Sequence, residues 1–172
     1  MTRAATAFAG ALLLAACGGA EEPDPQPGEV AAPILGQQEL PLQAVDFPAL
    51  ASDDCGDVVE FYLDAVGRGE WERAALVWDD PVIDGARLEA AFTGYEIPRI
   101  ATSDLSVEGA AGSLYCTVGG QLTDQGDPAR APQDGELLLR RSNDVPGATP
   151  EQLRWTLESS TFAENLERSR RS

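Results

Sequence analysis

The 172-residue chain contains no histidine and no lysine, and these two absences narrow what it can do. Histidine is the commonest general base and metal ligand, so a Ser-His-Asp or Cys-His catalytic group is excluded. All twelve basic residues are arginines, against 29 Asp and Glu, and the formal net charge is −17. This charge argues against binding to nucleic acid or to anionic lipid. No metal and no cofactor is expected.

The N-terminus has a short apolar run, and the residues that end it carry the clearest motif in the chain. Arg3 is followed by an uninterrupted run of apolar or small residues, 4–16, which is too short to span a bilayer. The run ends in Leu14-Ala15-Ala16-Cys17. This segment resembles a bacterial lipoprotein signal peptide, which implies that residues 1–16 are removed and that Cys17 carries diacylglyceryl and palmitate. An ordinary secretory signal with a chance cysteine is the alternative.

The lipoprotein resemblance also implies a location. Gly18 follows the cysteine, whereas an Asp there retains lipoproteins in the inner membrane of enteric bacteria. The resemblance therefore favours a lipid-anchored protein of the cell envelope, on the outer membrane facing the periplasm if the cell is Gram-negative.

Four further segments are predicted after the signal peptide. Residues 17–33 are rich in Pro, Glu, Asp and small residues, so they are predicted to form a lipidated, disordered tether. Residues 34–54 contain apolar residues between prolines and are predicted to form an extended arm. Residues 55–162 form the expected folded domain, and 163–172 a charged C-terminal tail.

Three helices are predicted at the start of the domain from their apolar spacing. Ser52-Asp53-Asp54 supplies candidate caps for the first helix, and Asp84 for the third. The apolar positions are Val58, Phe61, Tyr62, Ala65 and Val66 in the first helix, Trp71, Ala74, Ala75 and Trp78 in the second, and Leu88, Ala91, Phe92 and Tyr95 in the third.

Strands are predicted after the helices, where the apolar period changes to two. They cover 97–107, a segment around 114–118, 136–141 and 152–162. The last is the clearest, and Trp155 lies on its apolar face. We expect Trp71, Trp78 and Trp155 to be largely buried. Helices followed by antiparallel strands predict an α+β domain with the helices on one face of the sheet.

The stretch EFYLDAVGRGEWERAALVWDD and the final strand with its tryptophan resemble the nuclear transport factor 2-like superfamily, which includes SnoaL-like and ketosteroid-isomerase-like proteins. The resemblance covers about residues 55–162. It implies a cone-shaped fold, in which N-terminal helices pack on a curved antiparallel sheet with a pocket between them.

Two cysteines remain once Cys17 carries lipid. Cys55 and Cys116 form an even pair in an oxidising compartment, so they are predicted to form a disulfide. Two buried free thiols are the alternative. A metal site is disfavoured because two thiols without histidine lack the usual number of ligands.

The family resemblance also suggests a catalytic function as a second hypothesis. In ketosteroid-isomerase-like enzymes a tyrosine and a carboxylate polarise and deprotonate a carbonyl compound, and here Tyr62 and Asp84 lie near those positions. Asp79 and Asp80 are weaker candidates for the carboxylate. No second acidic donor is found on the strands, and the spacing after Asp80 departs from the family's. The competing reading is that Tyr62 is core and Asp84 a helix cap.

Two functions follow from these features. The first is a non-catalytic envelope lipoprotein whose domain binds an envelope protein or a small apolar ligand. The second is an isomerase- or hydratase-like enzyme that uses Tyr62 and Asp84. A third possibility is an acidic surface that attracts divalent cations or a basic partner, which is compatible with Asp53, Asp54, Asp79 and Asp80. Runs of charge are usually just solvated surface.

Overall fold

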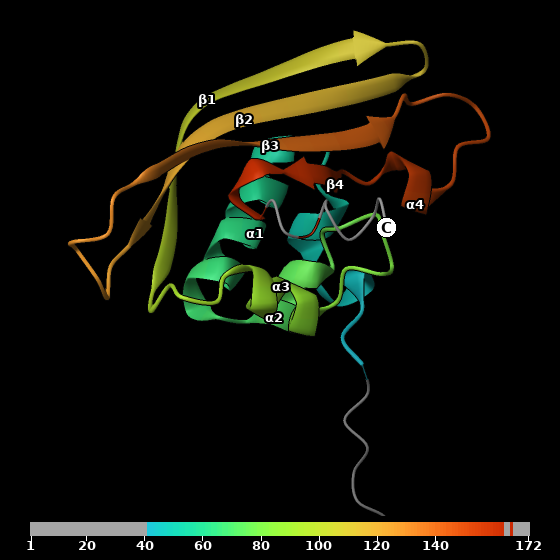
Figure 1. Ribbon diagram of the computed structural model, residues 1–172. Coiled ribbons are helices and arrows are strands. Elements are labelled where there is room, and N and C mark those ends of the chain that lie inside the picture. Colours follow the sequence, from blue (N-terminus) through green and yellow to red (C-terminus); the bar gives the residue numbers. More distant parts are fainter. Residues whose placement is uncertain (1–40, 164–165, 167–172) are drawn as a thin grey trace, which may run out of the picture. The chain divides into compact units, whose positions relative to one another are not determined.

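The longest helix, α1 (Cys55–Arg68), begins and ends where its sequence provides caps. The computed structural model describes residues 41–163 and residue 166 (Figure 1). Asp54 accepts a hydrogen bond from the Gly56 N–H at 2.8 Å, which satisfies a free donor of the first turn. Gly69 ends the helix in the left-handed region, at φ 69°, which glycine adopts without steric cost. The predicted apolar face is confirmed, because all five of its residues are buried: Val58, Phe61, Tyr62, Ala65 and Val66.

The second helix, α2 (Trp71–Ala75), is shorter than its apolar stripe predicts. Beyond Ala75 the chain meets the last strand instead of continuing the helix. Trp78 forms an isolated parallel bridge with Leu157, and the Leu157 N–H donates to the Val77 carbonyl at 2.7 Å. Trp78 is buried, as predicted, and Trp71 is partly buried and packs against the core, where it stacks on Phe92. Hydrogen bonding to the strand explains the early end of the helix.

Four strands form one antiparallel sheet in the order β1-β2-β3-β4, so each strand pairs with its neighbour in sequence. Their bounds are β1 Pro98–Ala110, β2 Ser113–Asp124, β3 Gln133–Ser142 and β4 Thr156–Ser160. The first two meet at a tight turn with positive φ at Ala111 (41°) and Gly112 (92°), which matches the twist of a hairpin. The register shifts between Thr102 and Leu105, and β1 bends strongly in Figure 1, as a bulge promotes.

The segment before β4 corrects the predicted strand 152–162. Residues Pro150–Leu153 form a short helical turn, α4, and the strand begins only at Thr156. Thr149 accepts from the Gln152 N–H while the Gln152 side chain accepts from the Thr149 N–H, which is a capping box. Proline follows the cap, at a position that tolerates its missing N–H. The capping box favours a helical turn here over the strand that the alternating apolar residues predict.

The segment before α1 also differs from the predicted extended arm. It contains two 3-10 turns, η1 (Ala44–Asp46) and η2 (Pro48–Ala51). Leu50 is fully buried, so this part of the chain belongs to the core. The signal peptide, the tether and residues 34–40 lie outside the described residues, as does the predicted tail except Ala163 and Leu166, which are both buried.

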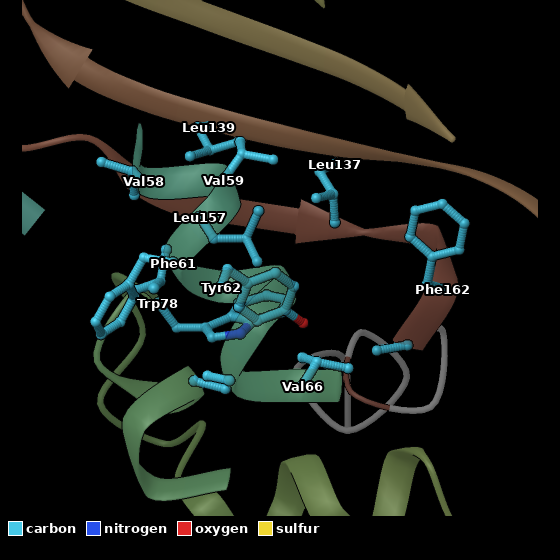
Figure 2. Close-up of a cluster of buried hydrophobic side chains, with 14 of the residues drawn as sticks. Val58, Val59, Phe61, Tyr62, Val66, Trp78, Leu137, Leu139, Leu157 and Phe162 are labelled. Carbon is cyan, nitrogen blue, oxygen red and sulfur yellow. The ribbon is translucent and has the colours of Figure 1, made fainter. Parts of the chain in front are cut away.

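The helices α1, α2 and α3 (Gly85–Ala91) lie on one face of the sheet (Figure 1). Figure 2 shows the contact between the layers, where the apolar face of α1 meets Leu137, Leu139 and Leu157 of the strands. The α+β fold class predicted from the sequence is thereby confirmed, and the core lies between the helices and the sheet.

Candidate functional site

Tyr62 points from α1 into the core and is 1% exposed. The Trp78 ring lies edge-on to it, with ring centres 6.5 Å apart, and its hydroxyl has no hydrogen-bond partner among the described residues (Figure 2). Burial raises the pKa of Tyr62 well above its ordinary value of 10, and the neighbouring Trp78 indole lowers it by less. The hydroxyl is therefore neutral and sealed from solvent.

Asp84 lies at the surface and caps α3. Its Oδ1 accepts the Arg87 N–H at 2.9 Å, so the carboxylate fills the role of a helix cap. The two weaker candidates are also placed by local structure: Asp80 accepts the Val82 N–H at 2.9 Å, and the Asp79 N–H donates to the Leu157 carbonyl at 3.3 Å. Tyr62 and Asp84 therefore lie in different environments. The Tyr62 hydroxyl is buried in the core, whereas the Asp84 carboxylate caps a helix at the surface.

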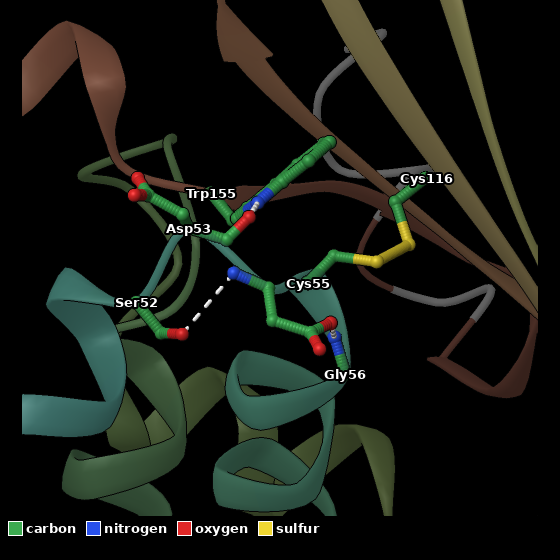
Figure 3. The surroundings of a disulfide bond; sticks show 7 residues. Ser52, Asp53, Cys55, Gly56, Cys116 and Trp155 are labelled. Atoms are coloured by element: carbon green, nitrogen blue, oxygen red, sulfur yellow. Dashed lines mark hydrogen bonds between the residues drawn. A yellow bond between two sulfur atoms is a disulfide. The ribbon is translucent and has the colours of Figure 1, made fainter.

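The predicted disulfide is present and joins Cys55, the first residue of α1, to Cys116 in β2 (Figure 3). The two Cα atoms are 6.5 Å apart. Cys17, the predicted lipid site, lies outside the described residues. Within those residues there is no group of histidine, cysteine and carboxylate side chains that could hold a metal ion. No helix from residue 41 to residue 163 is long and apolar enough to cross a membrane.

A hollow of ≈ 420 Å³ lies between the turns η1 and η2 and the helical turn α4. We call it the apolar groove, after the side chains along it: Ala44, Val45, Leu50, Ala51, Pro150 and Leu153. Val45 is 86% exposed and is therefore accessible to a ligand in the groove. The volume falls in the range of small-molecule sites, which are mostly apolar with a few placed polar groups. Here the polar groups are Asp53, Glu151 and Arg154.

A second hollow, of ≈ 340 Å³, adjoins the groove and shares Glu151 and Arg154 with it. We call it the arginine hollow, because its lining includes three of the twelve arginines of the chain: Arg140, Arg141 and Arg154. Asp79 is a further carboxylate on its wall. A concentration of arginine is unexpected in a chain that carries a net charge of −17.

Local structure positions the three guanidinium groups. Arg141 is 8% exposed, donates to an Asp53 oxygen at 3.0 Å, and lies 5.7 Å from the Trp155 ring centre. Arg154 ties separate parts of the chain together, since Nε donates to the Leu50 carbonyl and Nη2 to the Leu76 carbonyl. Partial burial lowers the pKa of Arg154, and the nearby carboxylates of Glu151 and Asp79 raise it by less.

Sequence reasoning missed both hollows. The signals it could have used are the consecutive pair Arg140-Arg141 at the end of a strand and the capping box before Arg154. Neither signal says that the two segments meet, because that follows from the pairing of β3 with β4.

Comparison with known proteins gives little further information. No family model matches the chain, and no curated protein matches it. One similar solved structure is a candidate dehydratase from the NTF2-like family of Streptomyces avermitilis. The match has a TM-score of 0.45 and 15% sequence identity, and it covers 66% of this chain and 95% of that chain. A likeness of this size assigns neither activity nor ligand to the chain.

Proposed function

We propose that the protein is a lipid-anchored, non-catalytic binding protein of the cell envelope, whose folded domain takes a small apolar ligand in the apolar groove. The observation that carries the proposal is the groove itself, which has a suitable volume and a wall of exposed and half-exposed apolar side chains. Leu50 forms its floor and is held from behind by the core, so the groove is a preformed surface.

The catalytic alternative has weaker support. An acid–base pair needs both groups within reach of one substrate atom. The Tyr62 hydroxyl is buried, and the Asp84 carboxylate is occupied with the cap of α3. Neither residue lines the apolar groove or the arginine hollow. A binding role requires neither group to react.

The lipid anchor is proposed from the motif that ends at Cys17. It accounts for membrane attachment of a chain whose acidic charge gives it no affinity for anionic lipid, and two or three acyl chains hold a protein stably. In a cell with an outer membrane, Gly18 after the cysteine favours that membrane, with the domain facing the periplasm.

The anchor is tested by metabolic labelling with a clickable palmitate analogue, followed by mass spectrometry of the mature N-terminus. We expect label on the wild-type protein and a mature end at Cys17, and no label on Cys17→Ser. Wild-type protein without label, or with another mature end, would refute the lipoprotein assignment.

The groove is tested by calorimetric titration with decan-1-ol, a neutral ten-carbon probe. The full chain carrying Cys17→Ser is used, so that attached lipid does not compete with the probe. We expect saturable binding that Val45→Asp weakens, because the new charge lies on the groove wall and would be desolvated by the probe. Val82→Asp is the matched control, an exposed valine in a turn that does not line the groove. Equal losses in both variants would remove the groove as the binding site.

A further inference from the structure

The apolar groove and the arginine hollow meet at the side chains of Glu151 and Arg154, which line both. A ligand that lies in the groove therefore reaches guanidinium groups at one end. The two surfaces differ in chemistry: six apolar residues line the groove, and three arginines line the hollow. Such a junction between an apolar wall and a charged pocket fits a molecule with an apolar body and a polar head.

The hydrogen bonds of the arginines show how much of their charge is already neutralised. Arg141 is paired with Asp53. Arg140 donates through Nε and Nη2 to the Ser113 hydroxyl, at 3.2 and 3.0 Å, and Arg154 donates only to backbone carbonyls. Among the described residues neither Arg140 nor Arg154 has an ion pair within 4.0 Å. Arg154 has the carboxylates of Glu151 and Asp79 near it, so of the three arginines Arg140 has the least compensated charge.

Carboxylates at the hollow offset the positive charge of its arginines. Asp79 and Glu151 line it and Asp53 is paired with Arg141, so three carboxylates balance the three guanidinium groups and the hollow offers N–H donors without a net positive charge. The Asp53 carboxylate lies at the edge of the groove, 94% exposed, and neutralises Arg141 from the solvent side. Glu151 sits at the junction itself. Its own backbone N–H and the Thr149 hydroxyl lower the pKa of Glu151, and Arg154 lowers it further, so this carboxylate is charged at neutral pH.

We propose that the two hollows form one site for a single-chain amphiphile with an anionic head, a carboxylate or a phosphate. The chain of the ligand lies along the apolar groove, and its head accepts hydrogen bonds from Arg140 and Arg154. Guanidinium groups suit both heads, because their planar forks of N–H donors match carboxylate and phosphate oxygens. This inference rests on the proposed function and specifies its ligand class.

The first experiment compares three ligands that share a ten-carbon alkyl chain and differ in their head group. The full chain carrying Cys17→Ser is titrated calorimetrically with decan-1-ol, sodium decanoate and decyl phosphate, each below its micelle concentration, at neutral pH and low ionic strength. We expect the two anions to bind about tenfold more tightly than the alcohol, since hydrogen bonds to charged groups are the stronger ones. Added sodium chloride should reduce this advantage, because the head is partly exposed to solvent. The order of decanoate and decyl phosphate identifies which head the hollow prefers.

The second experiment uses one substitution that removes a positive charge from the hollow and one that removes a negative charge. Arg140→Gln should weaken decanoate binding about five- to tenfold and leave decan-1-ol unchanged. Its guanidinium is exposed and bonded to one hydroxyl, so the substitution leaves the core intact. Glu151→Gln should strengthen decanoate binding, because it removes a negative charge from the junction. Arg68→Gln is the matched control, an exposed arginine of α1 that lines neither hollow. Circular dichroism and a thermal melt confirm that each variant is folded.

The outcomes separate this inference from the proposed function. Decan-1-ol and decanoate of equal affinity would overturn the anionic head and leave the apolar groove in place. An advantage for decanoate that survives Arg140→Gln and ignores Glu151→Gln would place the head elsewhere and overturn the assignment of the hollow. No binding of any ten-carbon probe would overturn both proposals.

Discussion

At the scale of single residues, Trp155 joins the two halves of the domain. Its indole is 2% exposed, and its Nε1 donates to the Asp53 carbonyl at 2.9 Å, just before α1 (Figure 3). Arg141 lies over the ring from the neighbouring strand. The sequence predicted this burial from the apolar residues around Trp155, but it offered no sign of the hydrogen bond, because the partner lies 102 residues away.

Replacing Trp155 tests how much this contact stabilises the domain. Trp155→Ala should lower the free energy of unfolding by about 3–5 kcal/mol, because it leaves a large cavity in the core. Trp155→Phe keeps most of the ring but removes the hydrogen bond to Asp53, and should cost about 1–2 kcal/mol. Urea denaturation followed by circular dichroism measures both. An unchanged midpoint for Trp155→Ala would mean that the indole does not support the core.

Asp124 is a charged residue whose side chain is fully buried at the end of β2. Its oxygens accept the N–H groups of Glu96, Ile97 and Gly126 at 2.9–3.0 Å, and Arg130 lies 3.6 Å away. Burial by itself raises the pKa of Asp124, but the backbone hydrogen bonds together lower it below its ordinary value of 3.8. The charged carboxylate therefore holds the chain before β1 against the loop after β2.

The lowered pKa predicts a pH dependence of stability. The unfolded chain binds a proton at Asp124 at a higher pH than the folded chain, so this residue's contribution is complete above about pH 4 and is lost as the pH falls through the folded value. Asp124→Asn should be destabilised at pH 7, since its amide group faces N–H donors. Its stability should also fall less steeply than that of the wild type below about pH 4. Urea titrations across pH 3–7 measure this, and parallel curves for the two proteins would contradict it.

At the scale of secondary structure, the sequence located α1, α3 and most of the strands because their signals are local. Helix spacing, capping residues and alternation of apolar residues are properties of neighbouring positions. The strand expected at 152 begins later because a local capping box starts α4 there, and another error arose where a distant segment competes with a local pattern. The helix expected to reach Trp78 ends at Ala75 because the chain there bonds to Leu157. The candidate site was beyond reach for the same reason, since the groove joins residues about a hundred positions apart.

The cap of α3 gives a test of the role of Asp84. Asp84→Ala should lower the free energy of unfolding by about 1 kcal/mol, because the Arg87 N–H loses its acceptor. Asp84→Asn should be close to wild type, since asparagine caps a helix about as well as aspartate. Denaturant titration distinguishes the two variants. If Asp84→Asn were as unstable as Asp84→Ala, the charge and not the cap would be the stabilising feature.

At the scale of the whole molecule, the Cys55–Cys116 disulfide links the helical layer to the sheet across a sequence separation of 61. It closes a loop that contains α1, α2, α3 and β1, while β3 and β4 lie outside it. Such a long loop restricts the unfolded chain strongly, which is the main way a disulfide stabilises a protein in the chain-entropy model.

Removing the disulfide should therefore have a large effect. The double variant Cys55→Ala, Cys116→Ala should lose about 4 kcal/mol of stability, in line with the length of the loop. Wild-type protein treated with reductant is the control and should match the variant closely. Thiol titration under denaturing conditions should find neither Cys55 nor Cys116 free without reductant. Two free thiols there would rule out the bond in the protein as isolated.

The same loop determines how the domain responds to a pulling force. When the chain is stretched from its two ends, tension passes along the backbone to Cys55, crosses the sulfur atoms to Cys116, and continues from there. The three helices and β1 carry no load, so only the segments outside the loop are extended. Mechanical unfolding of the oxidised protein should release about 200 Å less contour length than that of the reduced protein, since the separation of 61 residues spans that distance when extended. If the domain is anchored at one end and pulled at the other, the segment between Cys55 and Cys116 is thus not extended.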